Sequence, residues 1–131
     1  MTYHWVEHTA EVELVIEATS EEQVFEDAMR AYAELVAREP GGQPARHEIA
    51  LTAPDRPALL AAWLDELVFL AETERFVPER LTSLEFKDEG LQAVVQGRVD
   101  APAPLVKAVT YHRLEFVREA GRARARLVLD V

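Results

Sequence analysis

The sequence has no cysteine, and it has only two lysines, Lys87 and Lys107, against twelve arginines. The lack of cysteine excludes disulfides, thiolate nucleophiles and zinc sites built on sulfur, and it fits a reducing cytoplasm. The four histidines are too scattered for a zinc signature. No apolar run approaches the roughly 20 residues that a membrane helix needs, and the first residues lack the pattern of a signal peptide. We therefore expect a soluble cytoplasmic protein that does not enter a membrane.

Basic residues are scarce in the first half of the chain. Residues 1–74 hold sixteen Asp and Glu against four Arg, a balance of −12, whereas residues 75–131 hold eight acids against ten bases, a balance of +2. A surface this negative repels phosphate backbones, which disfavours direct tight binding of nucleic acid. Any connection to RNA is expected to pass through a basic protein partner, although acidic side chains also simply keep small proteins soluble.

Two stretches predict helices. The first begins after Ser20, a residue type that caps helices, and ends near Pro40. The second follows the candidate cap Asp55 and runs to about Glu74. It is the most hydrophobic element, and the spacing of Trp63 within it favours core filling over base stacking.

Alternating apolar and polar residues predict six strands. They cover residues 3–18, 47–53, 84–86, 91–99, 106–117 and 122–131. The resulting order is strand, helix, strand, helix and four strands. This order indicates a single α+β domain over residues 1–131, in which a mixed, mostly antiparallel sheet packs against two helices.

Carboxylates gather at the end of the last predicted strand. Asp130 lies on its polar face and is followed by Val131, whose terminal carboxylate would add oxygens in the same place. Carboxylates near one point repel unless a proton, a basic side chain or a hard cation joins them. Two interpretations stay open: a site for Mg²⁺, Ca²⁺ or Mn²⁺, or an ordinary surface ion pair with Arg124 or Arg126.

Three other side chains are candidates for chemistry. Lys107 interrupts an apolar segment, where its ammonium could reach an acid or a phosphate. It could equally be an edge-strand lysine that prevents pairing with a further strand. His8, within the dense polar stretch Glu7–Glu11, and His112 could titrate near neutral pH or bind a metal, and a lone histidine at a strand end is also a common hydrogen-bonding fixture. Nothing matches a nucleophile–base–orienter set or a glycine-rich phosphate loop, so the residues alone indicate a small acidic α+β domain with a candidate site for a hard metal ion.

Four strings in the chain resemble the archease family, in the same order and at similar separations. They are His8-Thr-Ala-Glu11, Trp63-Leu-Asp-Glu-Leu67, Lys107-Ala-Val-Thr-Tyr-His112 and Leu129-Asp130-Val131. The resemblance covers essentially the whole chain, and the string that begins at Lys107 is the most specific of the four.

The resemblance implies a non-catalytic accessory protein that activates the RtcB-type RNA ligase of tRNA splicing. In the family, the protein promotes guanylylation of the ligase's active-site histidine and its repeated turnover, in a system that depends on GTP and a divalent metal. The alternative is a chaperone-like modulator that prevents aggregation of RNA-modifying enzymes such as a tRNA methyltransferase. An independent metal-dependent hydrolase is disfavoured because no base or nucleophile accompanies the acids.

The resemblance also assigns residues by position. The family's metal-binding acids correspond to Glu11 and Asp130, with Val131 as an extra ligand, and its important lysine corresponds to Lys107. The family pattern has aspartate where this chain has Glu11, so the carboxylate here is one methylene longer. The acids are expected to present a divalent ion (Ca²⁺, Mg²⁺ or Mn²⁺) at the entrance of the ligase's active site, while Lys107 orients nucleotide phosphates or the acidic pair.

The two histidines belong to the same expected site. His8 and His112 lie within the matched strings, and the resemblance implies that they contact phosphate or the ligase.

Overall fold

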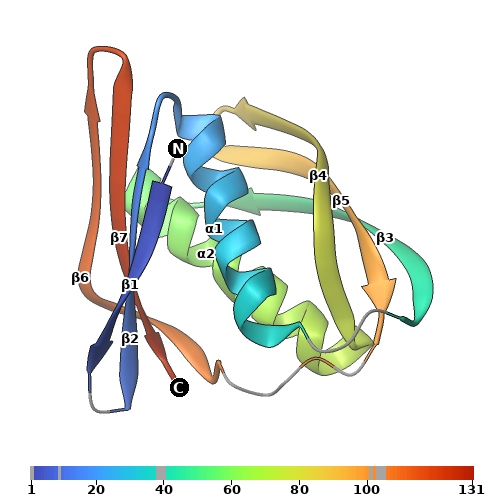
Figure 1. The fold of residues 1–131 in the computed structure, drawn as a ribbon. Coiled ribbons are helices and arrows are strands. Elements are labelled where there is room, and N and C mark those ends of the chain that lie inside the picture. The colour runs from blue at the N-terminus through green and yellow to red at the C-terminus, as the bar shows by residue number, and fades with distance from the viewer. Residues whose placement is uncertain (1, 9, 38–40, 101, 103–105) are drawn as a thin grey trace.

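Two helices lie between two antiparallel sheets (Figure 1). The computed structural model describes residues 2–8, 10–37, 41–100, 102 and 106–131, with only the backbone for Glu7 and His8. The order of elements is β1 (Thr2–His8), β2 (Glu11–Ala18), α1 (Glu21–Val36), β3 (Gln43–Thr52), α2 (Arg56–Glu74), β4 (Phe76–Lys87), β5 (Gly90–Val99), β6 (Ala108–Glu119) and β7 (Arg122–Asp130). The predicted α+β class with two helices is confirmed.

The strands form two sheets where the sequence predicted one. Sheet A has the order β1-β2-β7-β6 and sheet B the order β3-β5-β4, and every pair is antiparallel. The predicted first strand is in fact the hairpin β1–β2, in which His8 pairs with Glu11. Ala10, in the turn, has a φ of 61°, a conformation that glycine or asparagine usually signals. The sequence has neither residue there, which is why the pattern read as one continuous strand.

Helix α2 supports both sheets because its apolar surface is wider than a single stripe. Its buried residues are Leu59, Leu60, Ala61, Trp63, Leu64, Leu67, Val68 and Leu70. So wide an apolar surface must be covered on more than one side, and α2 contacts β6 of sheet A as well as β3 and β4 of sheet B. The predicted cap is present, since the Asp55 carboxylate accepts a 2.8 Å hydrogen bond from the backbone N–H of Ala58.

Phe25 of α1 joins the layers in the core. Its carbonyl accepts a 3.0 Å hydrogen bond from the indole N–H of Trp63, which is fully buried. Its ring centroid lies 5.2 Å from that of Phe86 in sheet B and 6.2 Å from that of Phe116 in sheet A. Trp63 therefore fills the core, as its spacing predicted.

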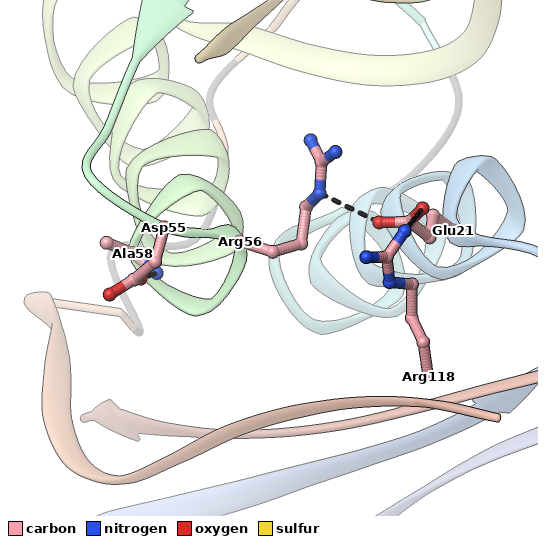
Figure 2. A network of polar contacts seen from close by, with 5 residues as sticks. All are labelled: Glu21, Asp55, Arg56, Ala58 and Arg118. Carbon is pink, nitrogen blue, oxygen red and sulfur yellow. Dashed lines mark hydrogen bonds and ion pairs between the residues drawn. The ribbon is translucent and has the colours of Figure 1, made fainter.

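A cluster of polar side chains at the surface, here called the polar corner, joins the two helices to each other and to both sheets. Glu21, in the first turn of α1, lies 2.8 Å from Nε of Arg56 in α2 and 2.7 Å from Nη1 of Arg118 in β6. Figure 2 shows the two guanidinium groups reaching this one carboxylate from different elements. Arg56 also stacks over the ring of Phe86 in β4, 4.2 Å from its centroid. Each helix start is thereby tied to a sheet.

The two faces of sheet A follow the predicted alternation. The face toward the helices carries buried residues such as Leu14, Ile16, Leu127 and Leu129. The other side, here called the outer face, carries the residues between them along β2 and β7, including Glu11 and Asp130. Among the described residues, no helix is long and apolar enough to cross a bilayer.

Candidate functional site

Residues from four separate stretches line up at one end of sheet A. His8 pairs with Glu11, Glu11 with Asp130, and Asp130 with Ala108, so the four form one row across β1, β2, β7 and β6. We call this set the site row. Glu11 and Asp130, as register partners on neighbouring strands, point to the same face of the sheet, here the outer one. The fold thus brings Glu11 and Asp130 together, although they stand at opposite ends of the sequence.

Glu11 and Asp130 form a non-hydrogen-bonded pair of the antiparallel ladder, the type in which the two Cα atoms lie closer together. The backbone N–H of Val131 donates a 3.2 Å hydrogen bond to the carbonyl of Ala10, so the ladder bonds flank the pair. In such a pair the Cα atoms are only about 4.5 Å apart and the side chains approach closely. Both residues are partly exposed. Two like charges in this arrangement are destabilising unless a cation joins them.

Lys107 is fixed to the same row through its backbone. Its N–H donates a 2.8 Å hydrogen bond to the carbonyl of Asp130. The exposed lysine also borders a cavity of about 260 Å³ between the two helices, together with Tyr32 and Glu72. Burial raises the pKa of the Tyr32 hydroxyl, so this phenol stays neutral at physiological pH. Lys107 therefore lies at the junction of the site row and an apolar cavity.

Asp65 is a residue of this region to which the sequence gave no role. Its Oδ1 accepts a 3.3 Å hydrogen bond from the backbone N–H of Val109, two residues after Lys107. Burial raises the pKa of the Asp65 carboxyl and the hydrogen bond from Val109 lowers it, although the side chain retains contact with solvent. The available signal was its place in the matched string from Trp63 to Leu67.

The two candidate histidines are placed differently. The backbone of His8 belongs to the site row, and its side chain lies outside the described part of the structure. His112 is exposed on β6, beyond the point where β6 leaves its regular pairing with β7, so it is not in the row. Its backbone N–H lies 3.3 Å from the hydroxyl oxygen of Thr110.

The arginines of β7 form ion pairs with other acids. Arg126 lies 3.5 Å from Glu13, and Arg124 lies 3.6 Å from Glu115. Both side chains lean toward the end of the sheet that carries Asp130, because Glu13 is level with Val128 and Glu115 is level with Arg126. Neither of these two contacts is with Asp130, the surface ion pair that the sequence left open.

The site row offers part of a metal site. Across the side chains that the structure describes, no three His, Asp or Glu gather closely enough to enclose an ion. Glu11 and Asp130 together provide carboxylate oxygens of the kind that Mg²⁺, Ca²⁺ and Mn²⁺ prefer. These cations take six or more ligands or keep several waters, so an ion held by this pair would need further oxygens from water, phosphate or another protein.

Comparison with known proteins identifies the family of the chain. The model of the Archease protein family (MTH1598/TM1083) matches residues 3–131. The chain is 32% identical over 139 residues to a protein archease of Methanosarcina mazei, covering 98% of this chain and 95% of the other. It is 32% identical to a protein archease of Methanothermobacter thermautotrophicus, covering 84% of each.

Two solved structures share the fold. The solution structure of Methanobacterium thermoautotrophicum protein 1598 is similar with a TM-score of 0.69 and 30% identity, covering 98% of both chains. A crystal structure from Thermotoga maritima, described as an archease and possible chaperone, has a TM-score of 0.69 and 19% identity, covering 96% of this chain and 94% of the other. From the match to the family model and the full-length relatives, the chain belongs to the archease family.

Proposed function

We propose that this protein is a non-catalytic activator of an RtcB-type RNA ligase in the cytoplasm, where it promotes guanylylation and multiple turnover of the ligase. The observation that carries the proposal is the close cross-strand pair of Glu11 and Asp130, together with the backbone hydrogen bond from Lys107 to Asp130. Membership of the archease family and the chemistry of these three side chains support it together.

The acidic pair fits an ion shared between two molecules. Glu11 and Asp130 would hold Mg²⁺, Mn²⁺ or Ca²⁺ from one side, and oxygens of the nucleotide or the ligase would complete the coordination. When bound, such an ion supplies positive charge that neutralises phosphate oxygens. A pair that lacks a full set of ligands can release the ion again, which suits an accessory protein better than a permanent metal site does.

Lys107 would act on the phosphates. Its backbone is held by the Asp130 carbonyl while its side chain is exposed, so the ammonium has a fixed base and a long reach. An ammonium is a compact point charge with three donors, suited to a phosphate oxygen. The lysine would therefore orient nucleotide phosphates beside the acidic pair.

The charge of the chain supports a protein partner over direct RNA binding. The net charge is −10, and the negative excess lies in residues 1–74, which include Glu11. Such a surface steers association with a basic protein and repels RNA.

Multiple-turnover ligation assays test the proposal. We expect wild-type protein to stimulate the ligase and Glu11→Ala, Asp130→Ala and Lys107→Ala to lose most of the stimulation. Glu17→Ala is the matched control, because Glu17 is an exposed acid of β2 that pairs in register with Arg124. Full stimulation by all three site variants would refute the proposal.

A second candidate is a chaperone-like modulator that prevents aggregation of RNA-modifying enzymes such as a tRNA methyltransferase. It is favoured by the exposed rings of Phe69 and Tyr111 and by the description of the Thermotoga maritima structure as a possible chaperone. Suppression of aggregation by both wild type and Asp130→Ala, without an effect on ligase turnover, would select this candidate over the first.

A further inference from the structure

β6 leaves the regular ladder just beyond the site row. Thr110 pairs with Val128 and Glu115 pairs with Arg126, so Tyr111, His112, Arg113 and Leu114 oppose the single residue Leu127. We call residues 111–114 the β6 bulge. β6 is an edge strand of sheet A (Figure 1). Bulges re-aim side chains and are over-represented at sheet edges and beside functional sites.

An ion-pair clamp holds the bulge in place. Arg113 has a φ of 60°, a left-handed conformation that costs a residue with a side chain about 1–2 kcal/mol. Its Nη1 donates a 2.9 Å hydrogen bond to Oε1 of Glu13, and Nε of Arg126 lies 3.5 Å from the other oxygen of Glu13. Strained residues persist where their surroundings over-determine them, and such positions concentrate at functional sites.

The clamp crosses the outer face of sheet A. Glu13 lies on β2 and Arg113 on β6, with β7 between them, so the arginine side chain spans the middle strand. Beneath this span, Glu13 is only 6% exposed and its register partner Val128 only 1% exposed, although both belong to the outer face. The bulge is thus a braced structure that covers the sheet next to the site row.

The β6 bulge carries an aromatic side chain, Tyr111, that lies outside the hydrophobic core. Tyr111 is 62% exposed, more than any other large hydrophobic side chain of the described residues. It follows Ala108 of the site row by three residues, so one partner surface that covers this end of β6 would contact Tyr111 together with Glu11 and Asp130. Tyrosine on a rigid base offers a large contact area at a small cost in conformational entropy, and it is enriched among residues that dominate binding energy.

Resting on the proposed function, we propose that the β6 bulge is the docking element for the ligase, with Tyr111 as its anchor. The occupant is a basic protein surface with an apolar pocket: the pocket receives the ring, and the basic rim faces Glu11 and Asp130. A nucleic acid that stacked on Tyr111 would bring a run of phosphates against a protein whose net charge is −10, which charge repulsion opposes. The bulge would set affinity, while the acidic pair and Lys107 would set the activation that follows binding.

The test measures binding and activation separately with full-length protein and ligase. For Tyr111→Ala, we expect the Kd for the ligase and the concentration for half-maximal stimulation to rise at least tenfold, with the maximal stimulation retained. For Asp130→Ala, we expect the opposite split: a lower maximum and a Kd within about twofold of wild type. Phe69→Ala is the matched control, because it removes a ring that is 55% exposed on α2, and it should change neither quantity.

Two variants address the clamp itself. Arg113→Ala and Glu13→Gln should each raise the Kd severalfold, and circular dichroism would establish that they remain folded at the assay temperature. Equal Kd values for wild type, Tyr111→Ala and Phe69→Ala would overturn the docking proposal, as would a wild-type dimer that Tyr111→Ala disrupts. If the wild-type protein bound the ligase but did not stimulate it, the proposed function would be refuted. The Kd values of the variants would still test whether the β6 bulge is the docking surface.

Discussion

Asp65 of α2 accepts a hydrogen bond from the backbone N–H of Val109, and this bond ties the central helix to the strand that begins beside Lys107. Loss of such a bond costs about 1 kcal/mol and leaves a backbone donor without its partner. Asp65→Ala should therefore lower the free energy of unfolding by about 1 kcal/mol or more, while Asp65→Asn keeps the accepting oxygen and should not. Urea unfolding at neutral pH measures both effects.

The Asp65 carboxyl should also make the stability of the protein depend on pH. Burial raises the pKa of Asp65 above its ordinary value of 3.8, so the ionised form is less stable in the folded protein than in the unfolded chain. The destabilisation by this group is complete above the raised pKa and disappears as the pH falls toward 3.8. Asp65→Asn should therefore be more stable than wild type at pH 7, with a difference that shrinks toward pH 4. A constant difference across that range would show that the carboxyl does not titrate in this way.

Glu11→Gln should change the response to divalent ions. It removes one of two like charges directly opposite each other, which should stabilise the metal-free protein by about 0.2–1 kcal/mol. Mg²⁺, Mn²⁺ or Ca²⁺ should raise the Tm of wild type, by the equivalent of about 2.7 kcal/mol at a concentration of 100 Kd. The ions should have little effect on the variant.

Glu17→Gln serves as the control for the metal response, because its register partner is Arg124 and not an acid. It should gain no stability and keep the wild-type response to metal. Identical metal responses in Glu11→Gln and wild type would place the ion elsewhere or exclude it from the isolated protein.

Ala10→Gly should stabilise the β1–β2 hairpin. Ala10 has a φ of 61°, and the left-handed conformation costs a non-glycine residue about 1–2 kcal/mol. Glycine removes this strain at an entropic cost of about 0.5–1 kcal/mol, so a net gain of about 0.5 kcal/mol is expected by thermal unfolding. Ala50→Gly, at an exposed position within β3, should instead lose stability, because no positive φ is relieved there.

Glu21→Gln should weaken the polar corner of Figure 2. The change leaves Arg56 and Arg118 without the carboxylate that both contact, and the expected loss is about 0.4–2 kcal/mol in the free energy of unfolding for two partly exposed ion pairs. Glu22→Gln removes an acid from the same helical turn and therefore reports the dipole contribution alone, about 0.3–1 kcal/mol. The difference between the two variants should fall as salt is added; equal losses in both would mean that the ion pairs contribute nothing.

The sequence predicted those parts of the fold that follow from local chemistry. The caps at Ser20 and Asp55 were identified because a short oxygen-bearing side chain satisfies the first helical N–H groups. The division into two sheets was missed because period-of-two patterns identify strands but not their partners. One observation did point to it: residues such as Leu60, Leu64 and Val68 extend the apolar surface of α2 beyond a single stripe.

The candidate site depended on the resemblance more than on the pattern. Polarity alone placed Asp130 on the polar face of its strand, and the register then placed it opposite Glu11. The clamp of Arg113, Glu13 and Arg126 could not be predicted, because alternation assigns Glu13 to solvent and gives no indication that a bulge covers it. Burial on the outer face of a sheet arises from tertiary contacts alone.

The position of β7 has a consequence for synthesis of the protein. β7 follows every other element in the sequence, yet it lies between β2 and β6 in sheet A. On the ribosome, β3, β4 and β5 can therefore pair before β7 has been made, while β2 must wait for a partner more than a hundred residues away. The row that holds Glu11 and Asp130 thus assembles only when translation has passed its last strand, and a nascent chain stalled before β7 lacks the acidic pair altogether.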